Sequence, residues 1–337
     1  MQANWQQFLS TQGAIIKDGI VQHFGDIAAE LTATAKETVL CELDQFSTLR
    51  VSGEDAQSFL QNLLSNDIRE VTATRAQYSS FNTAKGRMLA NFLIWMDGND
   101  YLLQLPGTLA ETLRKKLSMY VLRAKVKITR DEPIALGVSG PSARLPVDSS
   151  ELPVLGVIHA ENTSVIKLGD TRFLLCTTTE KAEALWQTLS KAARPAGSTC
   201  WDWLNIRAGI PVILEKTQEE FVPQMVNFDL IGGINFKKGC YPGQEIVARM
   251  HYLGKLKRRM YLAHIDGDAK PGDDLYSEDM AGQASGKIAN AAPSPIGGYD
   301  VLAVMQIASH DAHEVHLGSL QGPALSFEPL PYSLPSS

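Results

Sequence analysis

The amino-acid sequence predicts an α+β fold that ends in a small β-barrel. Three observations support this prediction: strand candidates joined by hairpin turn signals, helices with one apolar face, and short strand-like runs separated by Pro and Gly after residue 258. The chain has 337 residues, of which 44% are hydrophobic and 20% are charged. This composition and length are typical of a globular protein with two or three domains.

The first elements follow in order from residue 26. Residues 26–36 are rich in Ala, Leu and Glu and predict a helix, and strand-like runs follow at 38–43 and 47–51. Ser52 is predicted to cap the next helix, because Asp55 can reach back from its first turn. The apolar residues of that helix share one face and are assigned to the core: Ala56, Phe59, Leu60, Leu63 and Leu64.

A largely antiparallel sheet with a covering helix is predicted next. Its elements are strands at 77–82, 88–96 and 101–105, a helix at 108–120 and a strand at 121–128. Basic and apolar residues alternate along the last strand, so Arg123, Lys125 and Lys127 are interpreted as its solvated face.

The rest of the chain predicts a second, smaller α+β unit, one more helix and the barrel. The elements before the barrel are strands at 134–139, 164–168 and 172–177 and helices at 179–191 and 199–208. The barrel strands are predicted at 260–265, 274–276, 283–289, 301–306 and 315–319.

Charge and cysteine spacing exclude several classes of protein. The charge is 31 − 37 = −6, which does not suggest nonspecific coating of nucleic acid. Cys41, Cys176, Cys200 and Cys240 form no C-x-x-C, which argues against a zinc ribbon, a disulfide scaffold or a locally encoded iron–sulfur site. No apolar run approaches the roughly 18 residues that span a bilayer, and the N-terminus lacks a secretory pattern, so we expect a cytoplasmic protein without a membrane partner.

No metal site is predicted either. His310, His313 and His316 form an H-x-x-H-x-x-H pattern. They are expected in a turn between two strands, where this spacing does not place all three on one face. We interpret them as a solvated cluster.

The most informative stretch is Lys238-Gly239-Cys240-Tyr241-Pro242-Gly243-Gln244-Glu245. Pro242 suits the first position of a helix and Glu245 suits its first turn, which places Cys240 just ahead of a helix N-terminus. The helix dipole, Lys237 and Lys238 should together favour the thiolate form of Cys240, as in reactive cysteines. A small buried cysteine in a tight turn is the alternative.

Two segments are strongly basic. Residues 237–259 hold seven basic residues and one acidic residue, Glu245, which is a local charge of +6. The acidic partners that alternate with Lys and Arg on a solvated helix face are missing, so an anion-binding surface is favoured there. Residues 114–130 also hold seven basic residues and no acidic residue, and we interpret them as solvent-facing.

Aromatic residues offer a possible stacking surface. Trp201 and Trp203 lie two apart on a predicted helix and cannot share one of its faces. One of them could therefore stack on a pterin or a base, with packing in the core as the alternative.

Residues 238–245 resemble the signature of the YgfZ-type folate-binding proteins, relatives of the glycine-cleavage aminomethyltransferase. Three further pieces agree, so that the resemblance covers nearly the whole chain: Gly209-Ile210-Pro211, Lys85-Gly86-Arg87 and Glu328-Pro329-Leu330-Pro331-Tyr332. The resemblance implies a three-domain ring of the aminomethyltransferase type. The implied domains are a folate-binding α+β domain at 1–133, completed by a helix and signature segment at 196–256, a smaller α+β domain at 134–195 and the C-terminal β-barrel at 257–337.

The resemblance also implies a site that binds tetrahydrofolate or another reduced folate. Cys240 is its functional thiol and Lys238 the activator of that thiol. The residues assigned to the cofactor are Phe46 and Trp201 beside the pterin, Tyr241, Gln244 and Glu245 as framework, and Arg249 and Arg258 for the glutamate tail or a partner's anionic surface.

Two positions depart from the aminomethyltransferase. The adjacent aspartates of that enzyme, one of which is important for catalysis, are matched by Ala90 and Asn91, and neither can serve as a general base. The carboxylate with which the enzyme reads the pterin is replaced by Arg207. Glycine-cleavage chemistry is therefore not expected.

The resemblance favours an accessory protein that supports the assembly, repair or activity of iron–sulfur enzymes, including those that modify tRNA. Two alternatives stay open. One is a folate-dependent one-carbon transferase. The other is a scaffold that docks a protein partner or tRNA through its basic residues and needs no folate.

Overall fold

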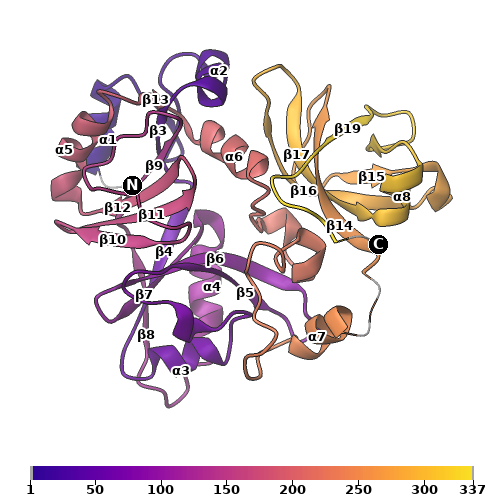
Figure 1. Ribbon diagram of the computed structural model, residues 1–337, viewed down its shortest axis with the longest axis horizontal. Helices are drawn as coiled ribbons and strands as arrows, with labels where there is room; N and C mark the ends of the chain where they lie inside the picture. Colours follow the sequence, from indigo (N-terminus) through magenta and orange to yellow (C-terminus); the bar gives the residue numbers. More distant parts are fainter. Residues whose placement is uncertain (1–2, 253, 255, 336–337) are drawn as a thin grey trace. The chain divides into compact units, whose positions relative to one another are not determined.

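The structure, a computed structural model, describes residues 3–252, 254 and 256–335. The chain forms two compact units, each assembled from separate stretches of sequence (Figure 1). Unit 1 comprises Met1–Phe59, Arg69–Gln77 and Leu93–Trp201, and unit 2 comprises Leu60–Ile68, Tyr78–Phe92 and Asp202–Ser337. The three-domain division stays a prediction.

The first sheet of unit 1 has the strand order β10-β11-β12-β9-β3-β13. Its strands are β3 (Val39–Glu42), β9 (Ile134–Ser139), β10 (Val157–Ala160), β11 (Thr163–Gly169), β12 (Arg172–Thr177) and β13 (Arg194–Ala196). Trp5 of helix α1 (Ala3–Thr11) and Trp186 of helix α5 (Thr179–Leu189) fill the core beside it. Four of these strands were predicted; the short strands β10 and β13 were not.

The N-terminal region adds a hairpin and a helix. Strands β1 (Ile15–Lys17) and β2 (Ile20–His23) pair with each other, and helix α2 (Ile27–Lys36) follows. Asp26 caps α2, because its carboxylate accepts the N–H groups of Ala28 and Ala29 at 2.9 and 3.3 Å. The helix predicted over residues 26–36 is confirmed.

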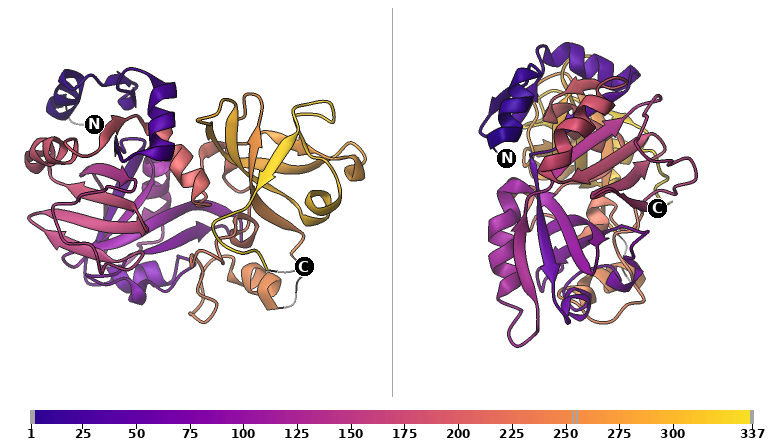
Figure 2. Two further views of the ribbon diagram at one scale, coloured as in Figure 1. Left: turned by 45° about the horizontal axis from the view of Figure 1, so that its top comes forward. Right: turned by 90° about the vertical axis from the view of Figure 1, so that its left-hand side faces the viewer.

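The second sheet has the order β5-β6-β7-β4-β8. Its strands are β4 (Phe46–Ser52), β5 (Gln77–Asn82), β6 (Met88–Asp97), β7 (Asp100–Pro106) and β8 (Lys127–Asp131). Helix α4 (Gly107–Ser118) packs on β4, β7 and β8, and the right-hand view of Figure 2 shows it covering one face of that sheet. It does so because Leu109, Ala110, Leu113 and Leu117 recur at helical spacing and are buried.

The strand predicted over residues 121–128 is wrong. Turns occupy most of this stretch, and β8 begins only at Lys127. The N–H of Lys125 donates to the Asp55 carboxylate at 2.8 Å and its carbonyl accepts the Asp55 N–H, so neither group is available for a sheet ladder. Leu122 adopts a φ of 47° and is 89% exposed.

The helix cap predicted at Ser52 is also wrong. Helix α3 (Ala56–Gln61) begins later, and Ser52 ends strand β4 with its hydroxyl on the carbonyl of Lys127. Because the Asp55 carboxylate accepts from Lys125, it does not reach back to form a capping box. The apolar residues assigned to this region are nevertheless buried as predicted: Ala56, Phe59, Leu60, Leu63 and Leu64.

Unit 2 contains a six-stranded antiparallel sheet with the order β18-β15-β16-β17-β14-β19. Its strands are β14 (Arg258–Ile265), β15 (Asp274–Tyr276), β16 (Ala284–Pro293), β17 (Tyr299–Gln306), β18 (His316–Leu317) and β19 (Leu325–Glu328). Five of these strands were predicted. The remaining helices are α6 (Ser198–Arg207), α7 (Gln244–Tyr252), α8 (Ile307–Ala312) and the short 3-10 turns Ile68–Glu70, Glu215–Thr217, Pro223–Val226 and Glu278–Met280.

The sheet of unit 2 curls into a half-barrel, which corrects the predicted closed barrel (Figure 1). Its edge strands β18 and β19 share no ladder in the described part of the chain, only an isolated bridge between His316 and Ala324. Strand β18 is only two residues long, and Pro323, which lies just before β19, has no N–H to donate. The two edge strands therefore do not form a continuous hydrogen-bonded ladder that would close the barrel.

Candidate functional site

The loop that carries Cys240 lies directly before helix α7 in unit 2. The helix begins at Gln244, two residues later than Pro242, where the sequence predicted its first turn. The N–H of Val247 donates to the carbonyl of Gly243 at 3.2 Å, which makes Gly243 the cap residue. Cys240 is exposed, whereas the other three cysteines are buried.

Two glycines hold this loop against the turn between β5 and β6. Gly243 has a φ of 80°, and a Cβ on it would lie 2.5 Å from the Cα of Gly86 and 2.5 Å from the carbonyl oxygen of Thr83. Gly86 has a φ of 72° itself. Only glycine tolerates this backbone conformation and so close an approach. Lys85-Gly86-Arg87 and residues 238–245, which are far apart in sequence, therefore meet in space.

The Lys238 side chain is buried and points toward the main chain that follows helix α3. Its ammonium group donates to the carbonyls of Gln61 at 2.6 Å, of Asn66 at 3.0 Å and of Leu64. These carbonyls end a helix and the turn after it, a position that favours a cation. The geometry gives Lys238 a structural task in holding the loop. Its role as activator of the thiol stays a prediction.

Tyr241 and Gln244 complete the framework of the loop. The Tyr241 ring is 7% exposed and its centroid lies 5.1 Å from the Lys238 ammonium, a cation–π distance. Burial raises the pKa of the Tyr241 phenol well above its usual value. The Gln244 side-chain amide donates to the carbonyl of Lys238 at 3.3 Å, and the Gln224 amide donates to that of Val247 at 2.6 Å.

Two polar residues, Ser65 and Asn66, anchor the start of the loop. Neither was singled out from the sequence. The Asn66 amide donates to the carbonyls of Tyr78 and Gly232 at 2.9 and 2.7 Å, and the Ser65 hydroxyl donates to that of Gly233 at 2.7 Å. Both side chains are buried. The signal available in the sequence was Ser65-Asn66-Asp67 directly after an apolar helix, where polar groups that become buried must bond to the main chain.

The basic residues of segment 237–259 fall into two groups. Some are committed, meaning that their charge is bound by other groups of the protein, and others are wholly or partly open to solvent. Arg259 is committed, because it binds the Asp229 carboxylate through two bonds of 2.7 and 3.0 Å. Lys238 is committed to the carbonyls. Lys237, Arg249 and Lys257 are exposed, Arg258 is half-buried, and Glu245 is an exposed carboxylate in the first turn of α7. Lys255 lies outside the described residues.

The two tryptophans of helix α6 are both buried, in different surroundings. Trp201 is 2% exposed; a Cβ on Gly137 would lie 2.4 Å from its ring, and the Arg172 guanidinium stands 4.4 Å from the ring centroid. Trp203 donates its indole N–H to Asp300 at 2.8 Å. Core packing accounts for both rings as placed, and a stacking role for Trp201 stays a prediction.

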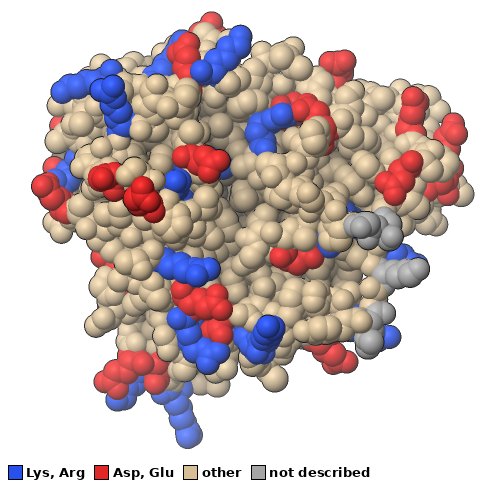
Figure 3. All heavy atoms as spheres, in the orientation of Figure 1, with Lys and Arg blue, Asp and Glu red and all other residues tan. Residues whose placement is uncertain are grey.

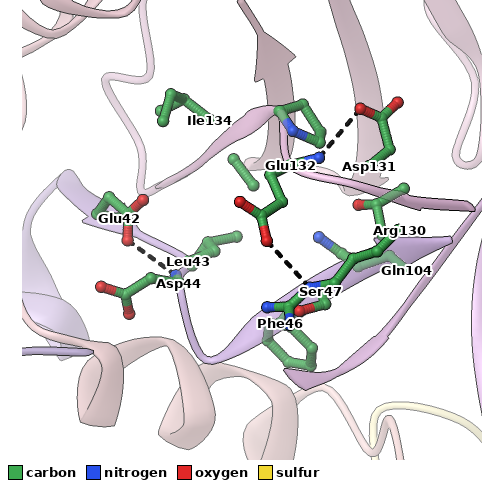
Figure 4. Close-up of a pocket in the computed structure, with 13 residues that line it drawn as sticks. Glu42, Leu43, Asp44, Phe46, Ser47, Gln104, Arg130, Asp131, Glu132 and Ile134 are labelled. Atoms are coloured by element: carbon green, nitrogen blue, oxygen red, sulfur yellow. Dashed lines mark hydrogen bonds and ion pairs between the residues drawn. The ribbon is translucent and has the colours of Figure 1, made fainter. Parts of the chain in front are cut away.

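Phe46 is half-buried and lines a pocket of unit 1 (Figure 4). The pocket holds about 60 Å³, whereas ligand sites usually offer about 300–1,000 Å³. Two buried polar atoms in its lining have no hydrogen-bond partner among the described residues: the amide nitrogen of Gln104 and the Oδ1 of Asp44. These atoms would suit water or a small polar group, but the pocket is too small for a pterin.

The same pocket is bordered by a buried pair of carboxyl groups, Glu42 and Asp44, which Figure 4 shows side by side. The Trp5 indole N–H and the Asp44 N–H donate to Glu42 at 3.2 and 2.8 Å, and the Val21 N–H donates to Asp44 at 3.0 Å. Burial raises the pKa of Glu42 well above its usual value and that of Asp44 to about 6. Neither residue was singled out from the sequence, which contains no local sign that both would be buried.

The two departures from the aminomethyltransferase have structural roles here. The Asn91 amide donates to the carbonyl of Pro211 at 2.8 Å and accepts the N–H of Ile213 at 2.8 Å. An aspartate could not make the first bond, because an ionised carboxylate has no donor. Arg207 binds Glu328 at 2.7 Å and lies 3.6 Å from Asp300.

The described residues contain no group of three His, Cys, Asp or Glu placed to hold a metal ion. His310 instead stacks on Tyr261, with ring centroids 3.7 Å apart. Nor does any helix within this part of the chain combine the length and apolar character needed to cross a bilayer.

Comparison with known proteins places the chain in a family. Residues 6–150 match the family described as the GCVT N-terminal domain. The chain is 31% identical over 319 residues to the tRNA-modifying protein YgfZ of Escherichia coli O7:K1 and to that of Shigella boydii serotype 4, with 90% of this chain and 96% of each relative covered. The chain belongs to the YgfZ family. The resemblance inferred from residues 238–245 is thereby confirmed.

A solved structure shares the fold of this YgfZ-family chain. It is the glycine cleavage system aminomethyltransferase T from Bartonella henselae, which superposes with a TM-score of 0.80 over 97% of this chain and 96% of that chain. The two sequences are 18% identical, so the likeness shows the fold alone. The prediction of an α+β fold of the aminomethyltransferase type is thereby confirmed at the level of a mixed α/β architecture.

Proposed function

We propose that the chain is a folate-binding accessory protein for tRNA modification and that it acts by supporting iron–sulfur enzymes. Two similarities support this proposal: the curated relatives are called tRNA-modifying proteins, and the fold is that of an aminomethyltransferase. The observation that carries it within this chain is an exposed thiol, Cys240, on a loop held by Lys238 and by the contact between Gly86 and Gly243.

An exposed thiol on a fixed loop is suited to chemistry rather than to packing. Free cysteines are usually buried, as Cys41, Cys176 and Cys200 are in this chain. The neighbours of Cys240 are fixed by bonds that the thiol itself does not make, so the loop keeps its shape without it. Cys240 is therefore assigned as the functional group and Lys238, Tyr241 and Gln244 as its support.

The folate part of the proposal rests on the family and on the cations Arg249, which is exposed, and Arg258, which is half-buried; both suit the glutamate tail. The pocket beside Phe46 does not fit a pterin, and no recognition step is assigned to it. Isothermal titration with tetrahydrofolate tests this part. Saturable binding that weakens when Arg249→Gln and Arg258→Gln are introduced supports it, and an absence of binding removes it.

The alternative of a one-carbon transferase is weakened by Asn91. Both polar atoms of its amide bond to the main chain at 2.8 Å, and the amide carries no charge with which to hold a substrate amine or to act as a general base. Turnover of tetrahydrofolate with a methylamine donor would restore the alternative. The scaffold alternative differs from the main proposal in needing no folate, so the same titration separates the two.

The role of Cys240 is tested in an Escherichia coli strain that lacks its YgfZ relative. We expect this chain to restore the content of modified tRNA nucleosides, measured by mass spectrometry, and the Cys240→Ala variant to leave it at the level of the deletion strain. The matched control is Gly239→Ala, at the residue directly before Cys240, where an added Cβ would meet no described atom within 4 Å. Equal protein levels and equal melting temperatures show that folding is unaffected, and full restoration by Cys240→Ala would refute the assignment.

A further inference from the structure

Three aromatic rings, one half-buried and two exposed, form a cluster beside the cysteine loop; the half-buried ring is that of Phe236. The rings of Phe236 and His251 stack with centroids 3.8 Å apart at 12°, and Tyr252 stands edge-on to them at 6.4 and 4.7 Å. Tyr252 is 62% exposed and His251 is exposed as well. Aromatic side chains normally gain stability by burial, so a preorganised cluster open to solvent indicates a binding surface.

Two cations flank this cluster. Lys237 follows Phe236 in the chain, and Arg249 lies one helical turn before Tyr252, at the spacing that places side chains next to each other. Both are exposed, and neither makes an ion pair within the described residues. They differ in this from Arg259, whose guanidinium is bound to Asp229.

The C-terminal part of unit 2 has the opposite charge. Residues 260–337 hold ten acidic and two basic residues, a net charge of 2 − 10 = −8. Figure 3 shows acidic side chains predominating on the right, over the part that Figure 1 labels β15, β19 and α8. An anionic partner of unit 2 is therefore repelled by the half-barrel sheet and attracted to the end of α7.

We propose that Phe236, His251 and Tyr252, with Lys237 and Arg249, form a docking surface for unpaired RNA nucleotides. This inference rests on the proposed function in tRNA modification and names the RNA as a direct partner of the chain. Flat rings with an open face suit unpaired bases, and the flanking cations suit phosphates. An acidic protein would be matched by the cations alone and would leave the aromatic faces without a role.

The test is fluorescence anisotropy with a labelled RNA hairpin that carries an unpaired loop. We expect the hairpin to bind more tightly than a blunt RNA duplex of the same length. Tyr252→Ala should weaken hairpin binding about 5- to 160-fold, the range for loss of one stacked base, while Tyr252→Phe should retain it. Arg249→Gln should reduce the slope of log K against log salt by about 0.7, which corresponds to one phosphate contact on a single strand.

Two matched controls come from the other basic segment. Arg123→Gln and Tyr120→Ala remove an exposed cation and an exposed tyrosine from residues 114–130, and we expect hairpin binding to stay unchanged. Melting temperatures equal to that of the parent protein show that each variant is folded. Equal binding of hairpin and duplex, or an unchanged affinity for Tyr252→Ala, would overturn the proposal.

A further competitor distinguishes a protein partner from RNA. If polyglutamate displaces the hairpin as effectively as unlabelled hairpin does, the surface binds acidic chains in general and the RNA proposal fails. The result of this RNA-binding test can be distinguished from the results of the tests of the proposed function. Titration with tetrahydrofolate and restoration of modified tRNA by the parent chain, but not by Cys240→Ala, can both succeed while the hairpin fails to bind.

Discussion

The two units bury charged groups in opposite ways. In unit 1 the carboxyl groups of Glu42 and Asp44 lie together at the C-terminal end of strand β3, where burial raises the pKa of both. In unit 2 the Lys238 ammonium lies among three main-chain carbonyls. Burial of a like-charged pair destabilises the ionised form, whereas a cation surrounded by carbonyl oxygens is satisfied.

This difference separates two kinds of buried charge. Removing the charge of Lys238 should destabilise its unit, because carbonyls lose their donor. Removing the charge of Asp44 should stabilise its unit at neutral pH, because burial disfavours the ionised carboxylate. The sign of the change in stability therefore distinguishes the two cases. A loss of stability means that the charged group holds its neighbours in place, and a gain means that the fold is stable in spite of the buried charge.

The largest expected effect is that of Lys238→Met. The variant leaves the carbonyls of Gln61, Leu64 and Asn66 without their donor, and we expect unit 2 to lose about 3–5 kcal/mol. Hydrogen exchange of the β5 and α7 amides measures this loss within the unit. The control is Lys127→Met, an exposed lysine of unit 1, which should change local stability by less than about 0.5 kcal/mol. A loss below about 1 kcal/mol for Lys238→Met would contradict the view that the Lys238 ammonium holds these three carbonyls in place.

A smaller loss is expected for Gly243→Ala. The new Cβ would meet the main chain of Gly86 at 2.5 Å in a residue whose φ is 80°. We expect a loss of about 2–3 kcal/mol, seen as faster exchange of the α7 amides. Gly239→Ala is the matched control in the same loop, because its Cβ would meet no atom within 4 Å. Similar losses for the two variants would show that the contact with Gly86 does not hold the loop.

Asp44→Asn should have the opposite sign. The pKa of Asp44 rises from 3.8 to about 6 on folding, so the folded state binds more protons between these values. Its contribution to stability is present below about pH 4, falls as pH rises toward 6 and is lost above that. We expect the variant to stabilise unit 1 by about 1–2 kcal/mol at pH 7 and to change it little at pH 4.

Hydrogen exchange of the β3 amides at both pH values checks this prediction. The Val21 N–H should keep its acceptor in Asp44→Asn, because the amide oxygen can replace the carboxylate oxygen that accepts it at 3.0 Å. A destabilisation at pH 7 would mean that the Asp44 charge has a favourable partner.

The smallest effect is expected for Cys240→Ala. The exposed thiol supports none of the bonds that hold its loop, so stability should change by less than about 0.5 kcal/mol. Hydrogen exchange of the α7 amides checks this directly. A large loss would mean that Cys240 organises the loop as Lys238 does, and the division between functional and supporting residues would fail.

Much of the secondary structure was predictable, because it follows from local patterns. The helix over residues 26–36 and the strands at 77–82 and 88–96 were found from propensity, apolar spacing and turn signals. The strand expected at 121–128 was not formed, because Lys125 bonds to Asp55, some 70 residues away in sequence. The predicted barrel failed to close because β18 is too short to pair with β19.

The candidate site was predictable as a motif but not as a geometry. Residues 238–245 identified the family, and Cys240, which the sequence singled out, is exposed; its functional role stays a prediction. The sequence counted seven cations in 237–259 as one surface, whereas the structure commits Lys238 to carbonyls and Arg259 to Asp229. Ser65 and Asn66 could not be linked to the loop from sequence, since their partners lie more than 150 residues further along the chain.

By itself, the sequence determined the family, the principal helices and strands and the residue type at each signature position, because these follow from local order along the chain. Tertiary structure alone decided which of those residues support the loop and which face solvent. The physical reason is that burial and hydrogen bonding are set by distant neighbours. Gly86 and Gly243, for example, are required as glycines because two distant segments of main chain come into contact at these residues.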